Sequence, residues 1–392
     1  MKYSYDRSEI KKISLSGFLS MVSVRNKRIA AAPDDLPVSE FNANRLAKSL
    51  HPAVQHVKIA KVEEHTEAKS FTLVPDKERG TESLAYFRAS QYVSVNLNIN
   101  GTALSKPYTI RSGPGSALGE DGTSYVLTIK LTRSGFASQW ILENWKEGDR
   151  VDISGPLGDF YYDRIRDAGT VVALAGGSGI TPFYSMAEAI ADGIEDFRLT
   201  ILYGSRTAEG ILLKDELDEV IARAGGKVKV VHVLSDEARE GYEHGFLTAE
   251  LVKKYAPEGD YSVFMCGPQA MYDYEEQELK KLGLPRRRIR RELSGDWLMS
   301  EPSARSYKLT LDVQGYRRTV ESLEWAIERA GIKAPTHCRS GECGWCHARL
   351  VSGEVFVPEQ ADGRRAADLK FGWVHPCASF PRSDVELEIF PG

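Results

Sequence analysis

The chain has 392 residues, a formal net charge of −4, and ordinary shares of hydrophobic (42%) and charged (27%) residues. This length leaves room for two to four domains with cores of their own, and the slightly acidic balance argues against nucleic-acid and membrane partners. No apolar run approaches the roughly eighteen residues that a membrane span needs, so we expect no membrane insertion.

Residues 1–55 are mixed and polar. A helix is predicted over Phe41–Leu50, beginning after Ser39, and the segment could form a small helical cap or a contact for a partner. The mildly apolar stretch Ile13–Val24 follows acidic residues and has no clean cleavage site after it. We therefore expect no signal peptide.

Residues 56–165 predict strands with no helices between most of them, separated by turns rich in Gly, Asn and Pro. This pattern is typical of a small antiparallel β-barrel. Two further segments stand within it, Ser105–Ser112 and Gly135–Trp140, and the second opens a helix. The predicted strands are Val57–Val62, Ala68–Val74, Gln91–Asn98, Tyr125–Thr132 and Arg150–Ser154.

Residues 166–297 predict an α/β doubly wound domain. Thr170–Ala175 is a continuous apolar run, typical of a strand buried on both faces, and it leads through Gly176–Pro182 into a helix over Phe183–Asp192. A strand, a glycine loop and a helix in this order place free backbone N–H groups where a phosphate can bind. Further strands at Arg198–Arg206, Lys227–Leu234 and Tyr261–Pro268 predict a parallel sheet, with its ligand at the carboxyl ends.

A run of arginines, Pro285–Arg291, follows this domain. Such a run can indicate nucleic-acid binding, but the whole chain is acidic and the run lies at a domain junction. We interpret it as a hinge strand whose charges face solvent, or cradle the cofactor or the face of the next domain.

Four cysteines near the C-terminus, Cys338, Cys343, Cys346 and Cys377, have the spacing C-x4-C-x2-C…C of a plant-type [2Fe–2S] cluster. A structural zinc site is the alternative, but its ligands usually come as two short C-x2-C pairs. His337 and His375 flank this loop, and we expect neither to bind iron. The remaining Cys266 has no partner to form a disulfide, so a cytoplasmic protein is expected.

Residues 304–392 predict the rest of this cluster domain. The pattern gives a strand at Ser306–Val313, a hairpin partner at Gly315–Val320, a helix over Ser322–Gly331 and a closing strand at Asp384–Ile389. This order resembles the β-grasp fold of plant-type ferredoxins. The nearly balanced charge of the domain favours a tethered module served mainly by its own neighbour.

Over roughly residues 55–392 the chain resembles the ferredoxin–NADP reductase superfamily in its three-module form: a flavin barrel, an NAD(P)H domain and a C-terminal [2Fe–2S] domain. Reductase components of bacterial ring-hydroxylating and of steroid- or acyl-modifying oxygenases look like this. The motifs that carry the resemblance are Lys-Pro-Tyr-Thr, Gly-x-x-Ser, Gly-Pro-Leu-Gly-Asp-Phe, Gly-Gly-Ser-Gly-Ile-Thr-Pro, Tyr-Gly-Ser-Arg and Cys-Gly-Pro.

The resemblance implies three residues of the reaction centre, Tyr108, Thr109 and Cys266. Tyr108 would lie against the flavin ring, the Thr109 hydroxyl would bond its reactive nitrogen, and Cys266 would line the nicotinamide pocket. By the same resemblance, cofactor contacts are expected from Lys106, Pro107, Tyr108, Thr109, Arg111, Ser112, Gly135, Ala137, Ser138, Gly176, Gly177, Ser178, Gly179, Thr181, Ser205, Arg206, Cys266, Gly267 and Pro268.

Several residues leave the type of flavin and of nicotinamide cofactor undecided. Family members usually have arginine where Lys106 stands, and lysine loses the planar fork that clamps flavin phosphate. Flavin could therefore bind more loosely, or with help from Arg111, and FAD is favoured over FMN. Ser205 and Arg206 could hold the 2′-phosphate of NADPH, but similar NADH enzymes carry the same residues. Glu292 matches a family position near the flavin, whereas Leu293 replaces the usual aromatic residue.

The function that these expectations imply is an NAD(P)H:acceptor oxidoreductase of the ferredoxin reductase type. NAD(P)H gives up electrons in pairs and a [2Fe–2S] centre takes them singly, so a flavin must stand between them. The expected partner is a separate electron-acceptor protein such as an oxygenase. The alternatives are a reductase or activator for a corrinoid or radical system in an anaerobe, or a non-turnover redox subunit of a larger complex.

Overall fold

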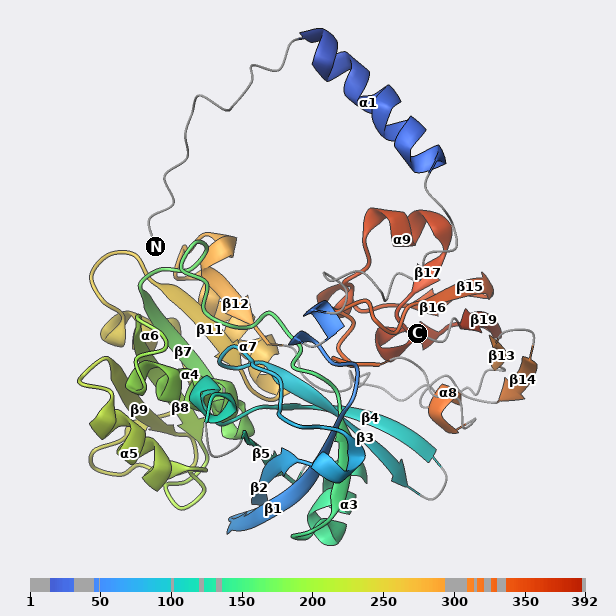
Figure 1. Ribbon diagram of the computed structural model, residues 1–392. Coiled ribbons are helices and arrows are strands. Elements are labelled where there is room, and N and C mark those ends of the chain that lie inside the picture. The colour runs from blue at the N-terminus through green and yellow to red at the C-terminus, as the bar shows by residue number, and fades with distance from the viewer. Residues whose placement is uncertain are drawn as a thin grey trace. The chain divides into compact units, whose positions relative to one another are not determined.

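The computed structural model describes residues 15–31, 46–48, 50–99, 102–119, 123–131, 136–292, 309–313, 316–320, 326–329 and 336–389. The chain divides into two compact units, Met1–Ser49 and Leu50–Gly392. In the first, helix α1 spans Leu15–Ala30, which the sequence had not predicted (Figure 1). Of the predicted helix Phe41–Leu50, residues 46–48 and 50 are helical, and the rest lies outside the described residues.

No helix in the described part of the chain has both the length and the apolar character that crossing a membrane requires.

The second unit begins with a six-stranded antiparallel sheet in the order β4-β3-β6-β1-β2-β5. A single bridge between Ile110, directly after β4, and Leu127 of β5 brings the two ends of this sheet together, so it curves into the predicted barrel while Thr102–Thr109 stays at an edge. Helix α3, Phe136–Asn144, lies beside it, and Phe71 and Trp145 meet edge to face at 5.2 Å in its core. The strands are β1 Gln55–His65, β2 Ala68–Pro75, β3 Tyr92–Ile99, β4 Thr102–Thr109, β5 Tyr125–Lys130 and β6 Arg150–Ile153.

Strand β4 was not predicted, because Pro107 breaks the pattern of a strand and cannot donate to a sheet. In the structure Pro107 lies opposite Ser94 of β3, and β4 is the end strand of the sheet order. An end strand tolerates a missing N–H on its outer side. The Lys106–Thr109 segment is therefore held in extended form at the rim of the barrel.

The next sheet is parallel throughout, in the order β10-β9-β8-β7-β11-β12, which confirms the predicted doubly wound domain. The chain builds outward from β7 in one direction and returns to β7's other side with β11, so the strand order reverses between them (Figure 1). In such sheets the ligand binds at this reversal. The elements are β7 Thr170–Gly176, α4 Thr181–Ala191, β8 Arg198–Ser205, α5 Lys214–Arg223, β9 Val228–Leu234, β10 Glu243–His244, α6 Ala249–Tyr255, β11 Ser262–Cys266, α7 Gln269–Lys280 and β12 Ile289–Arg291.

Strand β7 is buried on both faces, as its apolar run predicted. Val171, Ala173 and Ala175 belong to one core, with residues of α4 and α5. Val172 and Leu174 belong to the core on the opposite face, with residues of α6 and α7. The two layers of helices hold the strand ends, and hence the glycine loop, in fixed positions.

The structure favours the second interpretation of the arginine run, because Arg286, Arg287, Arg290 and Arg291 line the large cleft described below. The end of this run forms strand β12, which pairs in parallel with β11, so it is part of the nucleotide domain's sheet. Arg290 does not face solvent: its side chain is buried and forms an ion pair of 2.9 Å with buried Asp167. It also donates to the carbonyls of Asp159 and Tyr161, and thereby fixes the end of the barrel domain against the nucleotide domain.

The C-terminal sheet has the order β14-β13-β19-β15-β17, with β13 and β19 parallel and the other pairs antiparallel. This mixed sheet is the predicted β-grasp arrangement. Each predicted strand and the predicted helix has a described element inside its range, and the parts of those ranges at 306–308, 315, 322–325 and 330–331 lie outside the described residues. The elements between the cysteines were not predicted. The elements are β13 Leu309–Val313, β14 Tyr316–Val320, α8 Ala326–Arg329, β15 Ala348–Ser352, β16 Val355–Phe356, α9 Ala366–Phe371, β17 Trp373–Val374, β18 Phe380–Pro381 and β19 Val385–Ile389.

Candidate functional site

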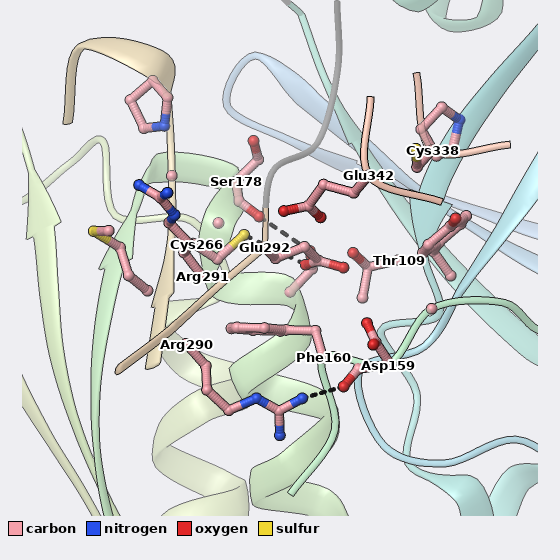
Figure 2. A pocket seen from close by; sticks show the side chains of 18 of the residues that line it. Thr109, Asp159, Phe160, Ser178, Cys266, Arg290, Arg291, Glu292, Cys338 and Glu342 are labelled. Atoms are coloured by element: carbon pink, nitrogen blue, oxygen red, sulfur yellow. Dashed lines mark hydrogen bonds between the residues drawn. The ribbon is translucent and has the colours of Figure 1, made fainter. Parts of the chain in front are cut away.

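A cleft of about 2290 Å³ is lined by residues of the barrel, the nucleotide domain and the C-terminal domain. The barrel supplies Lys106–Thr109 from β4, the nucleotide domain supplies the glycine loop and Cys266–Pro268, and the C-terminal domain supplies Cys338 and Cys343. Figure 2 shows Thr109, Ser178, Cys266, Glu292 and Glu342 around the same opening. Most of the predicted cofactor contacts therefore lie on one continuous surface.

On the barrel side, the cleft has a wall that suits a flat ring and a corner that suits a phosphate. Tyr108 is half-buried and packs on the barrel core, next to Thr109. Ala137 and Ser138 line the cleft in the first turn of α3, where no acidic residue stands. Free N–H groups in a first helical turn attract an anion. Gly135, predicted to belong here, lies outside the described residues.

Arg111 and Ser112 are placed elsewhere. The Arg111 guanidinium lies over the ring of Tyr184, 4.7 Å from its centroid, and the Ser112 carbonyl accepts a hydrogen bond of 2.8 Å from Ser185. Both partners belong to α4, so this pair joins the barrel to the nucleotide domain. Neither residue is among those that line the cleft, and a role of either in flavin binding stays a prediction.

The glycine loop lies against the end of β11 with no space between the two backbones. A Cβ on Gly179 would stand 2.1 Å from the carbonyl oxygen of Cys266, and one on Gly176 would stand 2.6 Å from Met271 Sδ. At Gly179 the clash is with backbone, so only glycine fits there, whereas at Gly176 the flexible Met271 side chain would have to move. The loop passes through a short 3₁₀ turn, Gly177–Ile180, into α4, where the Thr181 hydroxyl donates to the Ser178 carbonyl at 3.0 Å. This arrangement leaves a smooth backbone floor for a pyrophosphate.

Ser205 ends β8 and Arg206 follows it, and neither is among the residues that line the cleft. Arg206 Nε lies 2.7 Å from Asp236 Oδ2, in an exposed ion pair. The Arg206 guanidinium is therefore already paired with a carboxylate. In members of the resembling family, this position lies beside the adenosine ribose of the cofactor.

At the centre of the cleft, Cys266 and Glu292 are buried together. The Cys266 thiol donates to Glu292 Oε2 at 3.6 Å, and Tyr272 donates its hydroxyl to the Glu292 backbone carbonyl. Burial raises the pKa of the Cys266 thiol well above its usual value, and the Glu292 carboxylate adds to this shift. Cys266 is therefore a neutral thiol, which suits packing against a ring and not nucleophilic attack.

Burial also raises the pKa of Glu292 to about 8; the thiol of Cys266 opposes this, and the charges of Glu342 and Asp159 add to it. Glu292 therefore carries a proton at neutral pH. Glu342, on the cluster loop, and Asp159 also line the cleft. The sequence did not indicate that Glu342 and Asp159 would approach Glu292. The motif that ends in Asp159-Phe160 was the one signal that could have identified Asp159 as a site residue.

The shifted pKa of Glu292 predicts how stability depends on pH. Between its ordinary pKa of 4.5 and the folded value of about 8, the folded protein holds a proton that the unfolded chain releases. The free energy of unfolding should therefore fall as pH rises through this window, by up to about 1.4 kcal/mol per pH unit from this group. Glu292→Gln should remove that slope in denaturant titrations at pH 5, 6, 7 and 8.

Glu258→Gln, an exposed carboxylate on the same domain, is the matched control and should leave the pH dependence unchanged. If Glu292→Gln also left it unchanged, Glu292 would be ionised in the folded protein and the assignment of its proton would be wrong.

The four C-terminal thiols lie as two pairs. Cys346 Sγ is 3.2 Å from Cys377 Sγ, and the Cys343 amide donates to Cys338 Sγ at 3.4 Å. In the described residues, no three His, Cys, Asp or Glu side chains converge on one point as they would on a single ion. Two pairs suit two irons with two thiolates each, whereas a zinc site needs its ligands around one centre.

The loop that carries these thiols depends on glycine. Gly341 has φ of +83°, and a Cβ there would lie 2.1 Å from the Ala361 carbonyl oxygen. The hydrogen bond from the neighbouring Cys343 thiol, together with nearby backbone amides, holds the pKa of the Cys338 thiol below its usual range. His375 Nδ1 lies 2.7 Å from the Gly341 carbonyl oxygen and supports the loop from inside.

Three family models match the chain in the order of its sheets. They are an oxidoreductase FAD-binding domain over residues 57–162, an oxidoreductase NAD-binding domain over 173–277 and a 2Fe-2S iron-sulfur cluster binding domain over 310–382. These matches agree with the flavin-type wall, the glycine floor and the paired thiols described above.

Known proteins match this chain over most of their own length. The glycine betaine monooxygenase reductase subunit of Chromohalobacter salexigens is 26% identical, over 83% of this chain and 93% of that protein. NADH-cytochrome b5 reductase 1 of Candida glabrata is 31% identical over 56% of this chain and 81% of its own. Among solved structures, phthalate dioxygenase reductase matches with a TM-score of 0.62 and 26% identity, covering 86% of this chain and 98% of the other.

Proposed function

The chain belongs to the ferredoxin–NADP reductase superfamily, in its three-module form with a C-terminal plant-type [2Fe–2S] domain, and we propose that its electron acceptor is the oxygenase component of a multicomponent monooxygenase. It is an NAD(P)H-dependent oxidoreductase with FAD and a [2Fe–2S] cluster. The proposal concerns the acceptor, the choice of nicotinamide cofactor and the roles of individual residues.

Different parts of the cleft would contact different parts of the two cofactors. When bound, FAD accepts an electron pair as hydride and passes electrons on one at a time. Tyr108 and Thr109 would orient its ring, and the first turn of α3 would hold its phosphates. The backbone floor at Gly176–Gly179 would place the nicotinamide cofactor so that its ring reaches Cys266.

The centre of the cleft holds a neutral thiol and a protonated carboxyl group. The neutral Cys266 thiol gives the nicotinamide ring an apolar neighbour that does not react with it. Glu292 holds a proton on its carboxyl group at neutral pH, within contact of that thiol. The buried pair Arg290–Asp167 keeps β12, and hence Glu292 directly after it, in place. No acid or base is needed for bond cleavage, because hydride transfer supplies the chemistry.

We infer that NADH is used in preference to NADPH. A 2′-phosphate needs a free cation beside the adenosine ribose, and the Arg206 guanidinium is paired with Asp236. An acidic residue at this place suits the 2′-hydroxyl of NADH and repels a phosphate. The ratio of kcat/KM for the two cofactors measures this preference.

The oxygenase proposal rests on one observation: the three-module arrangement extends over nearly the whole length of a monooxygenase reductase subunit. The test mixes the purified holoprotein and NADH with oxygenase components from the same genome, and measures substrate-dependent NADH oxidation together with hydroxylated product. Coupled product formation supports the proposal. Rapid cytochrome c reduction with no substrate-dependent turnover from any of these components would reject it, in favour of another redox acceptor.

A further inference from the structure

The loop that carries the first cluster ligand is hydrogen-bonded to the flavin barrel. The Ser105 hydroxyl, on β4, donates to the Thr336 carbonyl at 3.1 Å. The Ser94 hydroxyl, on β3, donates to the His337 carbonyl at 3.3 Å. Both acceptors lie within two residues of Cys338, and helix α8 of the same domain lies beside β4 (Figure 1). Two strands of the barrel therefore hold the start of the cluster loop.

One charged side chain also crosses this boundary. Arg339, directly after Cys338, donates from Nη1 to the Ser105 carbonyl at 3.1 Å. The same guanidinium forms a two-pronged ion pair with Glu328 of α8, at 2.6 and 3.2 Å. Arg339 and Glu328 are each only 6% exposed. A guanidinium suits this geometry, because its planar fork can hold both oxygens of a carboxylate while a further N–H points elsewhere.

The backbone of Arg339 is held in an uncommon conformation. Its φ is +57°, in the left-handed region that favours glycine. Such a residue persists only where its surroundings fix it, and such residues gather at functional sites. The buried ion pair is also a costly way to stabilise a domain, since apolar side chains of similar size often serve as well. Both observations favour a role in fixing an orientation over a role in stability alone.

Arg339 joins two segments that approach the flavin from different domains. Ser105 directly precedes Lys106, and the segment Lys106–Thr109 lines the cleft in which the flavin would bind. Cys338 lines the same cleft. A single side chain therefore connects a position next to the flavin segment with a position next to a cluster ligand, and losing its bond would let Cys338 move relative to the flavin.

We propose that Arg339 is a positioning residue for electron transfer: with Glu328 it holds the cluster loop on β4, and so sets the distance between the flavin and the [2Fe–2S] cluster. This inference rests on the proposed position of FAD along Lys106–Thr109. A hydride from NADH brings two electrons to the flavin, one of which passes to the cluster while the other stays on the flavin. Electron transfer slows as its two centres move apart, and reacting groups misplaced by about 1 Å can lose roughly 100-fold in rate.

The test mixes the full-length holoprotein with NADH in anaerobic stopped flow, without an acceptor protein, and follows the bleaching of flavin and cluster separately. The double variant Arg339→Met/Glu328→Leu removes the buried pair without leaving a lone charge. It should keep the wild-type iron content, FAD content and rate of flavin reduction, and slow cluster reduction by about tenfold or more. Electron paramagnetic resonance of protein frozen after one equivalent of NADH should show a weaker magnetic coupling between the flavin and cluster spins.

Two further variants separate positioning from folding. Ser94→Ala/Ser105→Ala removes the two hydroxyl donors on the barrel and leaves the cluster domain unchanged, so it should slow cluster reduction by a smaller factor. Arg349→Met/Glu388→Leu is the matched control. It removes an ion pair of 3.8 Å between two strands of the C-terminal sheet and should behave as the wild type.

The proposal is overturned if the Arg339 double variant, with its full iron content, keeps the wild-type rate of cluster reduction and the wild-type spin coupling, or if the matched control slows this step as much. A double variant without a cluster, together with unchanged transfer in the serine variant, would also overturn it, because Arg339 would then serve folding alone. A wrong position of FAD is recognised separately, since Tyr108→Ala would then keep its FAD and its rate of flavin reduction. No acceptor protein is present, so the outcome is independent of the oxygenase test.

Discussion

Cys343→Ser should abolish one-electron delivery to cytochrome c while leaving NADH–ferricyanide reductase activity close to that of the wild type. Cys343 and Cys338 form the thiol pair on the cleft side, where the Cys343 amide donates to Cys338 Sγ, and together they would hold one iron of the cluster. Losing this ligand removes the [2Fe–2S] cluster, which carries electrons from the flavin to the acceptor. We expect cytochrome c reduction to fall by at least about 100-fold, roughly 2.7 kcal/mol in activation free energy. Ferricyanide can take electrons from the flavin directly.

The controls for this variant are its iron, sulfide and flavin contents. Cys266→Ser changes a thiol outside the cluster and should keep the wild-type iron and sulfide content. Iron and FAD are measured on the same preparations by absorbance and metal analysis. If Cys343→Ser retained rapid cytochrome c reduction, or lost both activities while keeping its flavin, electrons would not pass through this cluster in series.

The fold could be predicted where one local pattern was strong enough. The continuous apolar run of β7 predicted a strand buried on both faces, and the alternating pattern of the barrel strands predicted burial on one face. These two kinds of burial give different hydrophobic patterns in the sequence. Strand β4 could not be recognised, since Pro107 is acceptable only at a sheet edge, and the edge is a property of the finished sheet. The short elements β16–β18 and α9 are too brief to show any period.

The same limit explains the site. The loops at Gly176 and Gly267 were expected at the same edge because the carboxyl ends of parallel strands lie there, and a Cβ on Gly267 would stand 3.4 Å from the Cα of Gly176. Glu342 comes from a distant domain, so its approach to Glu292 depends on the packing of domains and leaves no trace in either local sequence. For Arg290 the sequence left open whether its charge faces solvent or a cofactor, and its ion pair with buried Asp167 depends on the folded structure.

The arrangement of the cleft also explains why the two halves of the reaction can be tested separately. The nucleotide floor is made of backbone from β7 and β11, whereas the cluster loop comes from the C-terminal domain. A change confined to the floor should therefore disable hydride delivery and leave the later electron transfers intact.

Gly179→Ala is that change. Its added Cβ would stand 2.1 Å from the carbonyl oxygen and 2.5 Å from the carbonyl carbon of Cys266, so the loop and the end of β11 must move apart. Both segments contact the nicotinamide cofactor in our proposal, and a displacement of this size disrupts the alignment on which hydride transfer depends. We expect kcat/KM for NADH to fall by about 100-fold or more. Once reduced by dithionite, the cluster should still reduce cytochrome c at the wild-type rate.

Two further variants distinguish this effect from general damage. Gly169→Ala adds the same methyl group where no atom lies within 4 Å, and should keep full activity. Gly177→Ala also has open space but a φ of +54°, so it should cost roughly 1 kcal/mol and impair NADH use only mildly. A Gly179→Ala protein that keeps its FAD and uses NADH as well as Gly169→Ala does would show that the nucleotide does not bind across this loop. The backbone contact with Cys266 would then serve folding alone.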